Sequence, residues 1–289
     1  MPGSESVVAE GPWAGSTLSE LIGRFGAELL GKANYARFGQ EFPLLVKFID
    51  AREDLSIQVH PDDELARKRH GKSGKCEMWY VLEAEPGASL LTGFSRPIAP
   101  AEYERRVADN TLTDVFESPG NRIGRRLLSA GRTGAQHRKG SFIVEIQQSS
   151  DITYRIYDFD RRDAAGNPRE LHTELAREAI DFESSENSRI TYAPENNQEV
   201  RLVTTPYFTT SLYTLTARTR CDWSATDSFR GNSSASGEWF IDRQRRQSNR
   251  CPAGRNLVVA RIDAMDRNHS AYSAPAPTDK PDLENPEFK

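Results

Sequence analysis

Short runs of apolar or alternating residues recur along the chain at the length of β-strands. The run at 42–49 is almost continuously apolar, whereas residues 56–60 alternate between apolar and polar. Together with clusters of β-branched and aromatic residues, these patterns predict strands at 42–49, 56–60, 78–82, 90–94, 141–147, 153–157 and 206–215. The chain is therefore predicted to be rich in β-structure.

Helical patterns are few and brief. Residues 16–31 place apolar side chains at helical spacing behind a capping box formed by Thr17 and Glu20. Further short helices are expected at 61–70, 99–107 and 170–182. Short strands separated by turns, with only a few helices, favour a closed β-sandwich or barrel over a repeated strand–helix–strand array.

Two segments, 118–140 and 230–289, break this regularity. Both contain many arginines and small polar residues, and neither shows the periodicity of a strand or a helix. The mean hydropathy of the chain is −0.66, which is low for a globular protein of 289 residues. These two segments account for much of that shortfall.

Charge and composition exclude several classes of function. The chain has 38 Lys and Arg against 42 Asp and Glu, so it lacks the polybasic footprint of a nucleic-acid-binding protein. No apolar run reaches the length of a membrane span, and the first residues lack the apolar core of a signal peptide. The three cysteines form no paired framework, so we expect reduced thiols and a cytoplasmic protein.

The residues with the clearest chemistry lie on two successive predicted strands. Gln58 and His60 belong to the first strand, and Glu77 begins the second, seventeen positions after His60. Two strands brought side by side can direct several oxygen and nitrogen donors at one metal ion. A catalytic zinc site needs one more protein nitrogen, which these two strands do not supply.

Four long motifs resemble those of the type I mannose-6-phosphate isomerases, zinc enzymes of the cupin (jelly-roll) superfamily. The block 41–217 carries them, as FPLLVKFID from Phe42, SIQVHPDDE from Ser56, GKCEMWYV from Gly74 and VEIQQSSDITYRIYD from Val144. The resemblance implies a mainly β fold, a cupin jelly-roll β-sandwich with a few short helices. It also implies interconversion of mannose 6-phosphate and fructose 6-phosphate, with a sugar phosphate as partner and Zn²⁺ as cofactor.

By this resemblance, Gln58, His60 and Glu77 correspond to metal ligands, and Arg155 corresponds to an active-site arginine. The residue types suit the reaction. Because an aldose–ketose interconversion passes through an enediol, it needs a cation beside the developing oxyanion and a base that moves a proton. The sequence does not identify the base.

Three further polar residues follow from the same resemblance. Lys75 and Glu145 correspond to residues that line the pocket, and Ser56 to a residue near the substrate phosphate. We therefore expect Arg155, Lys75 and Glu145 to be catalytic. Ser56 and Lys75 are expected to contact the substrate.

The main candidates also have plain structural interpretations. A histidine before a proline, such as His60, is often a buried structural residue, and Glu77 could simply face solvent. Arg155 could pair with Asp158 or Asp160 at the surface. The motifs that surround these residues favour the functional interpretation in each case.

The remaining nitrogen ligand is displaced in this sequence. In the family a histidine stands about twenty residues before the position of Arg155, and that position is Ala135 here. The nearest histidine, His137, lies two positions further along. An even shift keeps a residue on the same face of a strand if the strand pairing is unchanged, so His137 is the candidate for this ligand.

A shifted reading frame offers a second explanation. Codons can be chosen for residues 126–140 so that the same nucleotides, read one base later, spell Gly-Phe-Phe-Pro-Pro-Ala-Gly-Arg-Ala-His-Ser-Ile-Gly-Lys-Gly. This text restores the family motif with its histidine, and the same operation gives family-like text at 230–234 and 253–263. We hypothesise compensated frameshifts in the gene or in its sequencing, which resequencing across codons 115–142 and 228–270 would test.

Family members also carry a further segment before the part that resembles residues 2–8, so an N-terminally truncated chain with exposed sheet edges is expected. We accordingly expect an incomplete zinc-site cupin domain at 1–217 and a degraded cupin-like segment, with possible disorder, at 218–289.

Two functional hypotheses remain open at this point. The first is the isomerase, impaired or intact, and the alternative is a non-catalytic cupin that binds a sugar phosphate or a protein partner. A metal-dependent cupin oxygenase is disfavoured because Gln58 stands where such a site would carry a second histidine.

Overall fold

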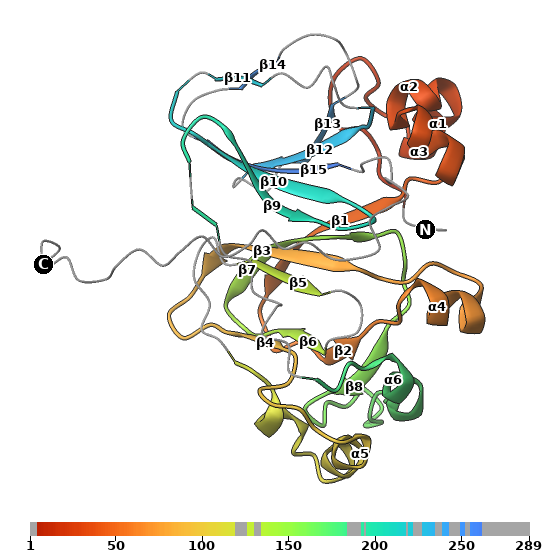
Figure 1. Ribbon diagram of the computed structural model, residues 1–289, viewed down its shortest axis with the longest axis vertical. Coiled ribbons are helices and arrows are strands. Elements are labelled where there is room, and N and C mark those ends of the chain that lie inside the picture. The colour runs from red at the N-terminus through yellow and green to blue at the C-terminus, as the bar shows by residue number, and fades with distance from the viewer. Residues whose placement is uncertain are drawn as a thin grey trace, which may run out of the picture.

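The strands of the protein stack in layers, with short helices beside and below them (Figure 1). This arrangement comes from a computed structural model. It describes residues 5–118, 126–129, 134–183, 192–193, 195–217, 219–221, 227–234, 239–242, 249–251 and 255–261. The statements below concern these residues.

Two four-stranded sheets face each other and form the sandwich that carries the candidate site. The first sheet has the order β1 (Leu44–Ala51), β7 (Ser141–Gln148), β3 (Glu77–Ala84) and β5 (Arg126–Ser129). The second has the order β4 (Leu90–Thr92), β6 (Ala135–His137), β2 (Ile57–Val59) and β8 (Tyr154–Tyr157). All pairings within both sheets are antiparallel, so the predicted β-sandwich is confirmed.

A third sheet covers the outer side of the first. Its order is β13 (Trp239–Asp242), β12 (Arg230–Ser234), β15 (Arg255–Arg261), β10 (Thr209–Leu215) and β9 (Glu199–Thr204). A separate two-stranded sheet pairs β11 (Thr219–Cys221) with β14 (Asn249–Cys251). Strands from before and after residue 218 pair within this third sheet, so it joins residues from both sides of the expected domain boundary.

The helices are short and lie outside the stacked sheets (Figure 1). They are α1 (Leu18–Phe25), α2 (Ala27–Leu30), α3 (Lys32–Phe38), α4 (Asp63–His70), α5 (Pro100–Ala108), the 3₁₀ turn η1 (Leu112–Val115) and α6 (Thr173–Ala179).

The prediction of a single helix over 16–31 was wrong, although the capping box of Thr17 and Glu20 is present at its start. Gly26, at φ 47°, separates α1 from α2, and a Cβ at this position would lie 3.2 Å from the ring of Tyr35. The helix therefore stops where only glycine fits.

Alternation along β3 decides which side chains face the site. Met78 and Tyr80 point outward and pack in the large core shared with the third sheet, together with Leu212. Trp79 and Val81 point the other way, toward the second sheet. Because side chains alternate along a strand, Glu77 shares the inner face with Trp79. Burial on both faces explains why β3 reads as an almost continuous apolar run.

The second sheet alternates in the same manner. Ile57 and Val59 of β2 pack outward, with Ile156 of β8, in a separate core that α5 and α6 cover. The intervening residues of β2 therefore face the first sheet. This geometry directs Gln58 of the SIQVH motif into the space between the sheets.

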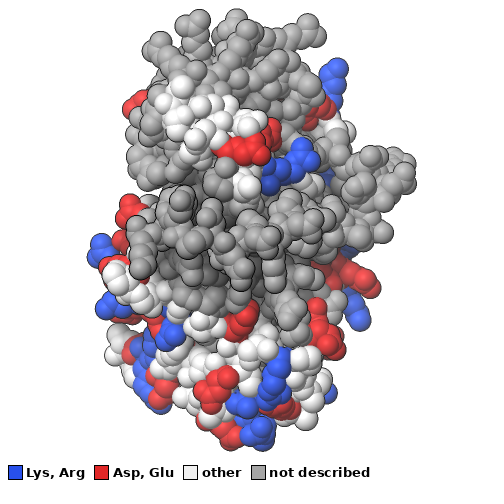
Figure 2. Space-filling model, turned by 60° about the vertical axis from the view of Figure 1, so that its left-hand side comes forward, with Lys and Arg blue, Asp and Glu red and all other residues white. Residues whose placement is uncertain are grey.

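The surface of the described residues carries both signs of charge. On the face shown in Figure 2, blue and red side chains alternate over the lower half of the molecule. Among the described helices, none is long and apolar enough to cross a membrane.

Candidate active site

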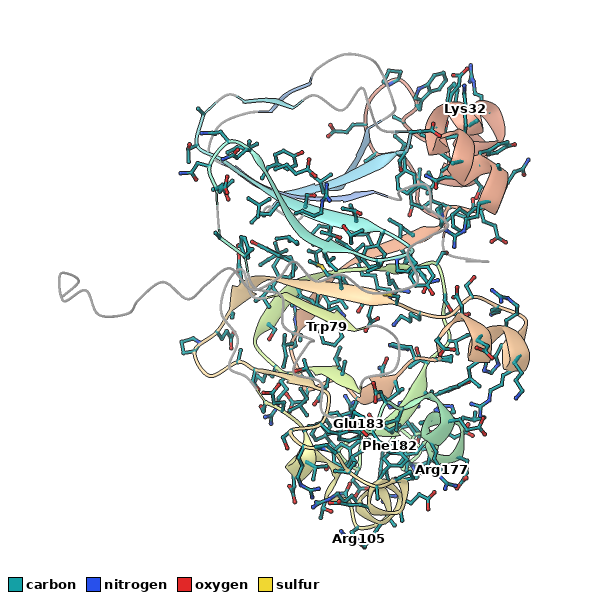
Figure 3. All side chains as sticks on the ribbon, in the orientation of Figure 1. Lys32, Trp79, Arg105, Arg177, Phe182 and Glu183 are labelled. Carbon is teal, nitrogen blue, oxygen red and sulfur yellow. The ribbon has the colours of Figure 1, made fainter. Side chains whose placement is uncertain are left out.

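A cavity of about 180 Å³ lies between the two sheets of the sandwich. It is lined by Lys47, Ile49, Leu55, Ser56, Gln58, His60, Lys75, Glu77, Trp79, Ala135, Gln136 and Glu145. Trp79 marks its place on the inner side of β3 (Figure 3). Six of the predicted site residues thus line one cavity, although the first and the last are about ninety positions apart in the chain. They are Ser56, Gln58, His60, Lys75, Glu77 and Glu145.

His60 is held in a fixed orientation. Its ring is 2% exposed, and Nδ1 lies 3.0 Å from the carbonyl oxygen of Ile152. Because a carbonyl oxygen only accepts, Nδ1 donates this hydrogen bond and Nε2 presents its lone pair. Nε2 lies 3.1 Å from Nζ of Lys75 and 3.5 Å from Oε1 of Glu77.

Glu77 and Lys75 form a buried ion pair. Nζ of Lys75 lies 2.7 Å from Oε2 of Glu77, and both side chains are less than a tenth exposed. Burial by itself would raise the pKa of Glu77, but the positive charge of Lys75 outweighs it and, with His60 close by, lowers that pKa well below its usual range. The interpretation of Glu77 as a solvent-facing residue is therefore wrong.

The pKa of the thiol of Cys76, the residue before Glu77, is shifted in the opposite direction. Cys76 points to the opposite face of the strand, where burial and then the charges of Glu77 and Asp63 raise the pKa of its thiol. A thiol with a raised pKa is a poor nucleophile and a poor metal ligand.

Gln58 and Ser56 lie together on the inner face of β2. The side-chain amide of Gln58 donates to Oγ of Ser56 over 2.9 Å. Ser56 is 4% exposed, so its hydroxyl is directed into the protein interior. The two residues form one polar wall of the cavity.

Lys47 is a member of the site that sequence reasoning did not select. Its Nζ lies 2.7 Å from Oε1 of Glu145 and 2.5 Å from Oε1 of Gln147, on the strand that pairs with its own. The signal was present in the sequence, because Lys47 is the one charged residue within the apolar run 42–49. A charge in a buried strand indicates a partner or a function.

Gln136 is a second such residue. It is 1% exposed, and its amide nitrogen donates to the carbonyl oxygen of Leu55. Its Oε1 has no hydrogen-bond partner among the described residues. Buried polar atoms normally have such a partner, so this open acceptor makes Gln136 a candidate member of the site. No pattern in 118–140 indicated it.

Arg155 lies beside the cavity but not in its lining. It faces Gln58 across the β2–β8 pair, and its Nη1 donates to the carbonyl oxygen of Glu170 over 2.9 Å. Burial and then the charge of Arg169 lower its pKa. The alternative of a surface ion pair with Asp158 or Asp160 was wrong for the described residues, since Asp158 pairs with Arg161 and Arg169 and Asp160 pairs with Arg162.

Strand pairing distinguishes the two candidate positions for a further nitrogen ligand. Ala135 lies directly opposite Gln58 and lines the cavity, whereas His137 pairs with Leu90 of β4. The side chain of His137 lies outside what the structure describes. Within the described residues, no three His, Cys, Asp or Glu side chains form a group that could hold a metal ion.

Together, the two facing antiparallel sheets and the polar cavity between them define a cupin-type sandwich with an internal site. Residues 2–90 match the family described as "Phosphomannose isomerase type I, catalytic domain". The chain is 35% identical over 215 residues to the mannose-6-phosphate isomerase of Streptococcus mutans, covering 72% of this chain and 64% of that protein. It is 39% identical over 184 residues to mannose-6-phosphate isomerase ManA of Bacillus subtilis, covering 62% and 56%.

Solved structures agree with the sequence comparisons. The crystal structure of the mannose 6-phosphate isomerase from Bacillus subtilis matches with a TM-score of 0.74 at 26% identity, over 90% of this chain and 87% of that one. A mannose 6-phosphate isomerase bound with zinc and yttrium matches with a TM-score of 0.60 at 13% identity, over 86% of each chain, which shows the shared fold. The family model over residues 2–90, these relatives and the solved structures all make the chain similar to type I phosphomannose isomerases. The chain spans less than two thirds of the length of the curated relatives quoted above.

Proposed function

We propose that the cavity is a zinc-dependent aldose–ketose isomerase site that interconverts mannose 6-phosphate and fructose 6-phosphate in the cytoplasm. The observation that carries this proposal is the convergence of Gln58, His60 and Glu77 on one buried cavity. In a chain similar to mannose-6-phosphate isomerases, that convergence favours the isomerase over a cupin that only binds.

The donor set fits zinc. His60 and Glu77 supply the nitrogen and oxygen donors that zinc takes in catalytic sites, and they lie 3.5 Å apart. The hydrogen bond from Nδ1 of His60 to a backbone carbonyl is the arrangement that orients metal-binding imidazoles. We propose Gln58, His60 and Glu77 as ligands, and zinc held there would act as a Lewis acid on the sugar oxygens.

The remaining lining residues supply the proton transfer and the charge. We assign Glu145 as the base that moves a proton between the two sugar carbons, since it is the lining carboxylate outside the ligand set. Lys75 and Arg155 would stabilise the negative charge that develops on the enediol oxygens. The hydroxyl of Ser56 and the ammonium of Lys75 would contact the substrate.

Position 135 is the place for the last nitrogen ligand in this proposal. The tenth residue of the family-like text obtained for 126–140 in the shifted frame is its histidine, and counting from Arg126 places it at position 135. The pairing of Ala135 with Gln58 supports this position. His137 stays the alternative candidate, two residues or about 7 Å further along the strand.

The test combines zinc content with turnover. The purified chain should convert mannose 6-phosphate to fructose 6-phosphate in a coupled assay with added zinc, and the variant Glu77→Gln should lose both bound zinc and turnover. The matched control is Glu83→Gln, at the exposed end of the same strand. Binding of sugar phosphate without turnover, at full zinc occupancy, would instead support the non-catalytic cupin.

A further inference from the structure

Three hydrogen bonds join Arg155 to one short segment of the chain, residues 170–172. Its backbone N–H donates to Nδ1 of His172 over 3.0 Å, and its carbonyl accepts from the N–H of His172 over 2.7 Å. Its guanidinium donates to the carbonyl oxygen of Glu170. The placement of the Arg155 side chain therefore depends on where residues 170–172 lie.

Residues 170–172 are the end of a loop that leaves β8 at Asp158, and the base of this loop is closed by an ion pair. Nε of Arg169 donates to Oδ2 of Asp158 over 2.6 Å, and its Nη2 donates to Oδ1. This is the two-pronged geometry in which arginine binds carboxylates most strongly. The side chain of Asp158 is 6% exposed, whereas that of Arg169 is 43% exposed, so the carboxylate is the buried member of the pair.

The loop contains backbone conformations that need support. Phe159 and Asp160 have φ of 55° and 51°, values that residues other than glycine rarely adopt. Arg161 donates to both the carboxylate and the carbonyl of Asp158, which fixes this turn from inside. Strained backbone conformations of this kind are retained where surrounding contacts hold them in place.

Asp158 also balances charge. Arg155, Arg161 and Arg169 lie close enough for the last two to act on the first electrostatically. Asp158 is the carboxylate that Arg161 and Arg169 share, so its removal would leave three mutually repelling guanidinium groups beside β8.

We propose that Asp158 and Arg169 are positioning residues: their ion pair holds the loop so that the carbonyl of Glu170 fixes the guanidinium of Arg155, the residue that pairs with Gln58 across β8 and β2. The significance of this for turnover rests on the isomerase function proposed above. The structural part of the inference does not depend on that function.

The structural part is tested by the reactivity of Arg155 toward phenylglyoxal, read by peptide mass spectrometry on the folded protein. Nε of Arg155 is buried and its Nη1 is held by the carbonyl oxygen of Glu170, so we expect slow modification in the native chain. Asp158→Asn should accelerate modification of Arg155 at least fivefold. Asp160→Asn, which removes a neighbouring exposed carboxylate paired to Arg162, should not. An unchanged rate in a folded Asp158→Asn variant would overturn the proposal.

The catalytic part is tested by a double-mutant cycle. Misplacing a reacting group by about 1 Å can lower the rate constant about a hundredfold, so we expect Asp158→Asn to lower kcat at least tenfold with KM changed less than threefold. In the Arg155→Met background the same substitution should have no further effect, and Asp158→Glu should restore part of kcat. Equal losses in both backgrounds would show a general structural role and contradict positioning.

The two failures can be told apart. If the native chain shows no isomerase turnover at full zinc occupancy, the proposed function fails, while the modification rates still decide whether Asp158 holds Arg155. If turnover is present and Asp158→Asn leaves both kcat and the reactivity of Arg155 unchanged, the positioning role fails and the function stands.

Discussion

Ala135 lies directly opposite Gln58 in the antiparallel pairing of β6 with β2, and both residues line the same cavity. Directly opposed residues in such a pair have Cβ atoms about 5 Å apart and point to the same face of the sheet. A longer side chain with a nitrogen donor at this position would therefore reach the space that Gln58, His60 and Glu77 share.

This relationship predicts a gain of metal affinity from one substitution. Ala135→His should tighten zinc binding at least tenfold, about 1.4 kcal/mol, because it adds a fourth protein donor. Competition with a chromophoric chelator measures the change. The gain should persist when His137→Ala is added, and it would be contradicted by an affinity that depends on His137 and not on position 135.

The buried ion pair of Lys75 predicts a loss of stability. Lys75→Met removes the cation that lies 2.7 Å from Glu77 and leaves a buried carboxylate, at a cost of about 3–5 kcal/mol in the free energy of unfolding. Urea unfolding in the presence of a chelator measures it. The control is Lys72→Met, whose ion pair with Asp151 is more than half exposed and should be worth less than about 1 kcal/mol. Equal effects of the two substitutions would contradict a buried pair.

A close backbone contact between distant parts of the chain predicts a third effect. Gly31 has φ 91°, and a Cβ there would lie 2.4 Å from the carbonyl oxygen of Asp227. The carboxylate of Asp227 also accepts from the backbone N–H of Lys32, at the start of α3 (Figure 3). Gly31→Ala should therefore destabilise the fold by about 2–4 kcal/mol, from steric overlap added to the strain of positive φ.

The matched control for Gly31 is Gly39→Ala. Gly39 also has positive φ, at 60°, but has nothing within 4 Å of the added Cβ. It should cost only about 1 kcal/mol in the same thermal or urea unfolding experiment. If the two variants were equally stable, the contact between Gly31 and Asp227 would be excluded.

Asp158 predicts a dependence of stability on pH. Burial alone would raise its pKa, but hydrogen bonds from Arg169 and Arg161 outweigh it and lower the pKa below the usual 3.8. A carboxyl group with a lowered pKa in the folded state stabilises the fold fully above its unfolded pKa, and this stabilisation is lost as the pH falls through the folded value. The stability advantage of the native chain over Asp158→Asn should be constant from pH 7 to about 5 and shrink below pH 4. An advantage that grew on acidification would have the wrong sign.

The inner face of the sandwich could be predicted well from sequence. In the SIQVH motif, alternation places Ser56, Gln58 and His60 on one face, and this face is the one that lines the cavity. The physical reason is that a strand with a period of two leaves its side chains only two directions, so one functional residue determines its neighbours. The same rule indicated the inner face of β3 from Glu77.

Other features depended on contacts that periodicity does not encode. The break at Gly26 follows from the nearby ring of Tyr35, and the burial of Gln136 follows from its hydrogen bond to Leu55. The strands at 126–129 and 135–137 carry polar residues without alternation, and their pairing to β3 and β2 determines them. The ion pair of Asp158 with Arg169 spans a loop, and no sequence period reports it.

The central claim is that this cavity isomerises a sugar phosphate with zinc held by His60 and its neighbours. The most direct measurement is turnover of mannose 6-phosphate by the native chain, with bound zinc determined on the same sample and His60→Ala as the comparison. We expect fructose 6-phosphate to form in proportion to bound zinc, and the variant to lose both. Stoichiometric zinc in the native chain without isomerisation, or turnover unchanged in His60→Ala, would contradict the claim.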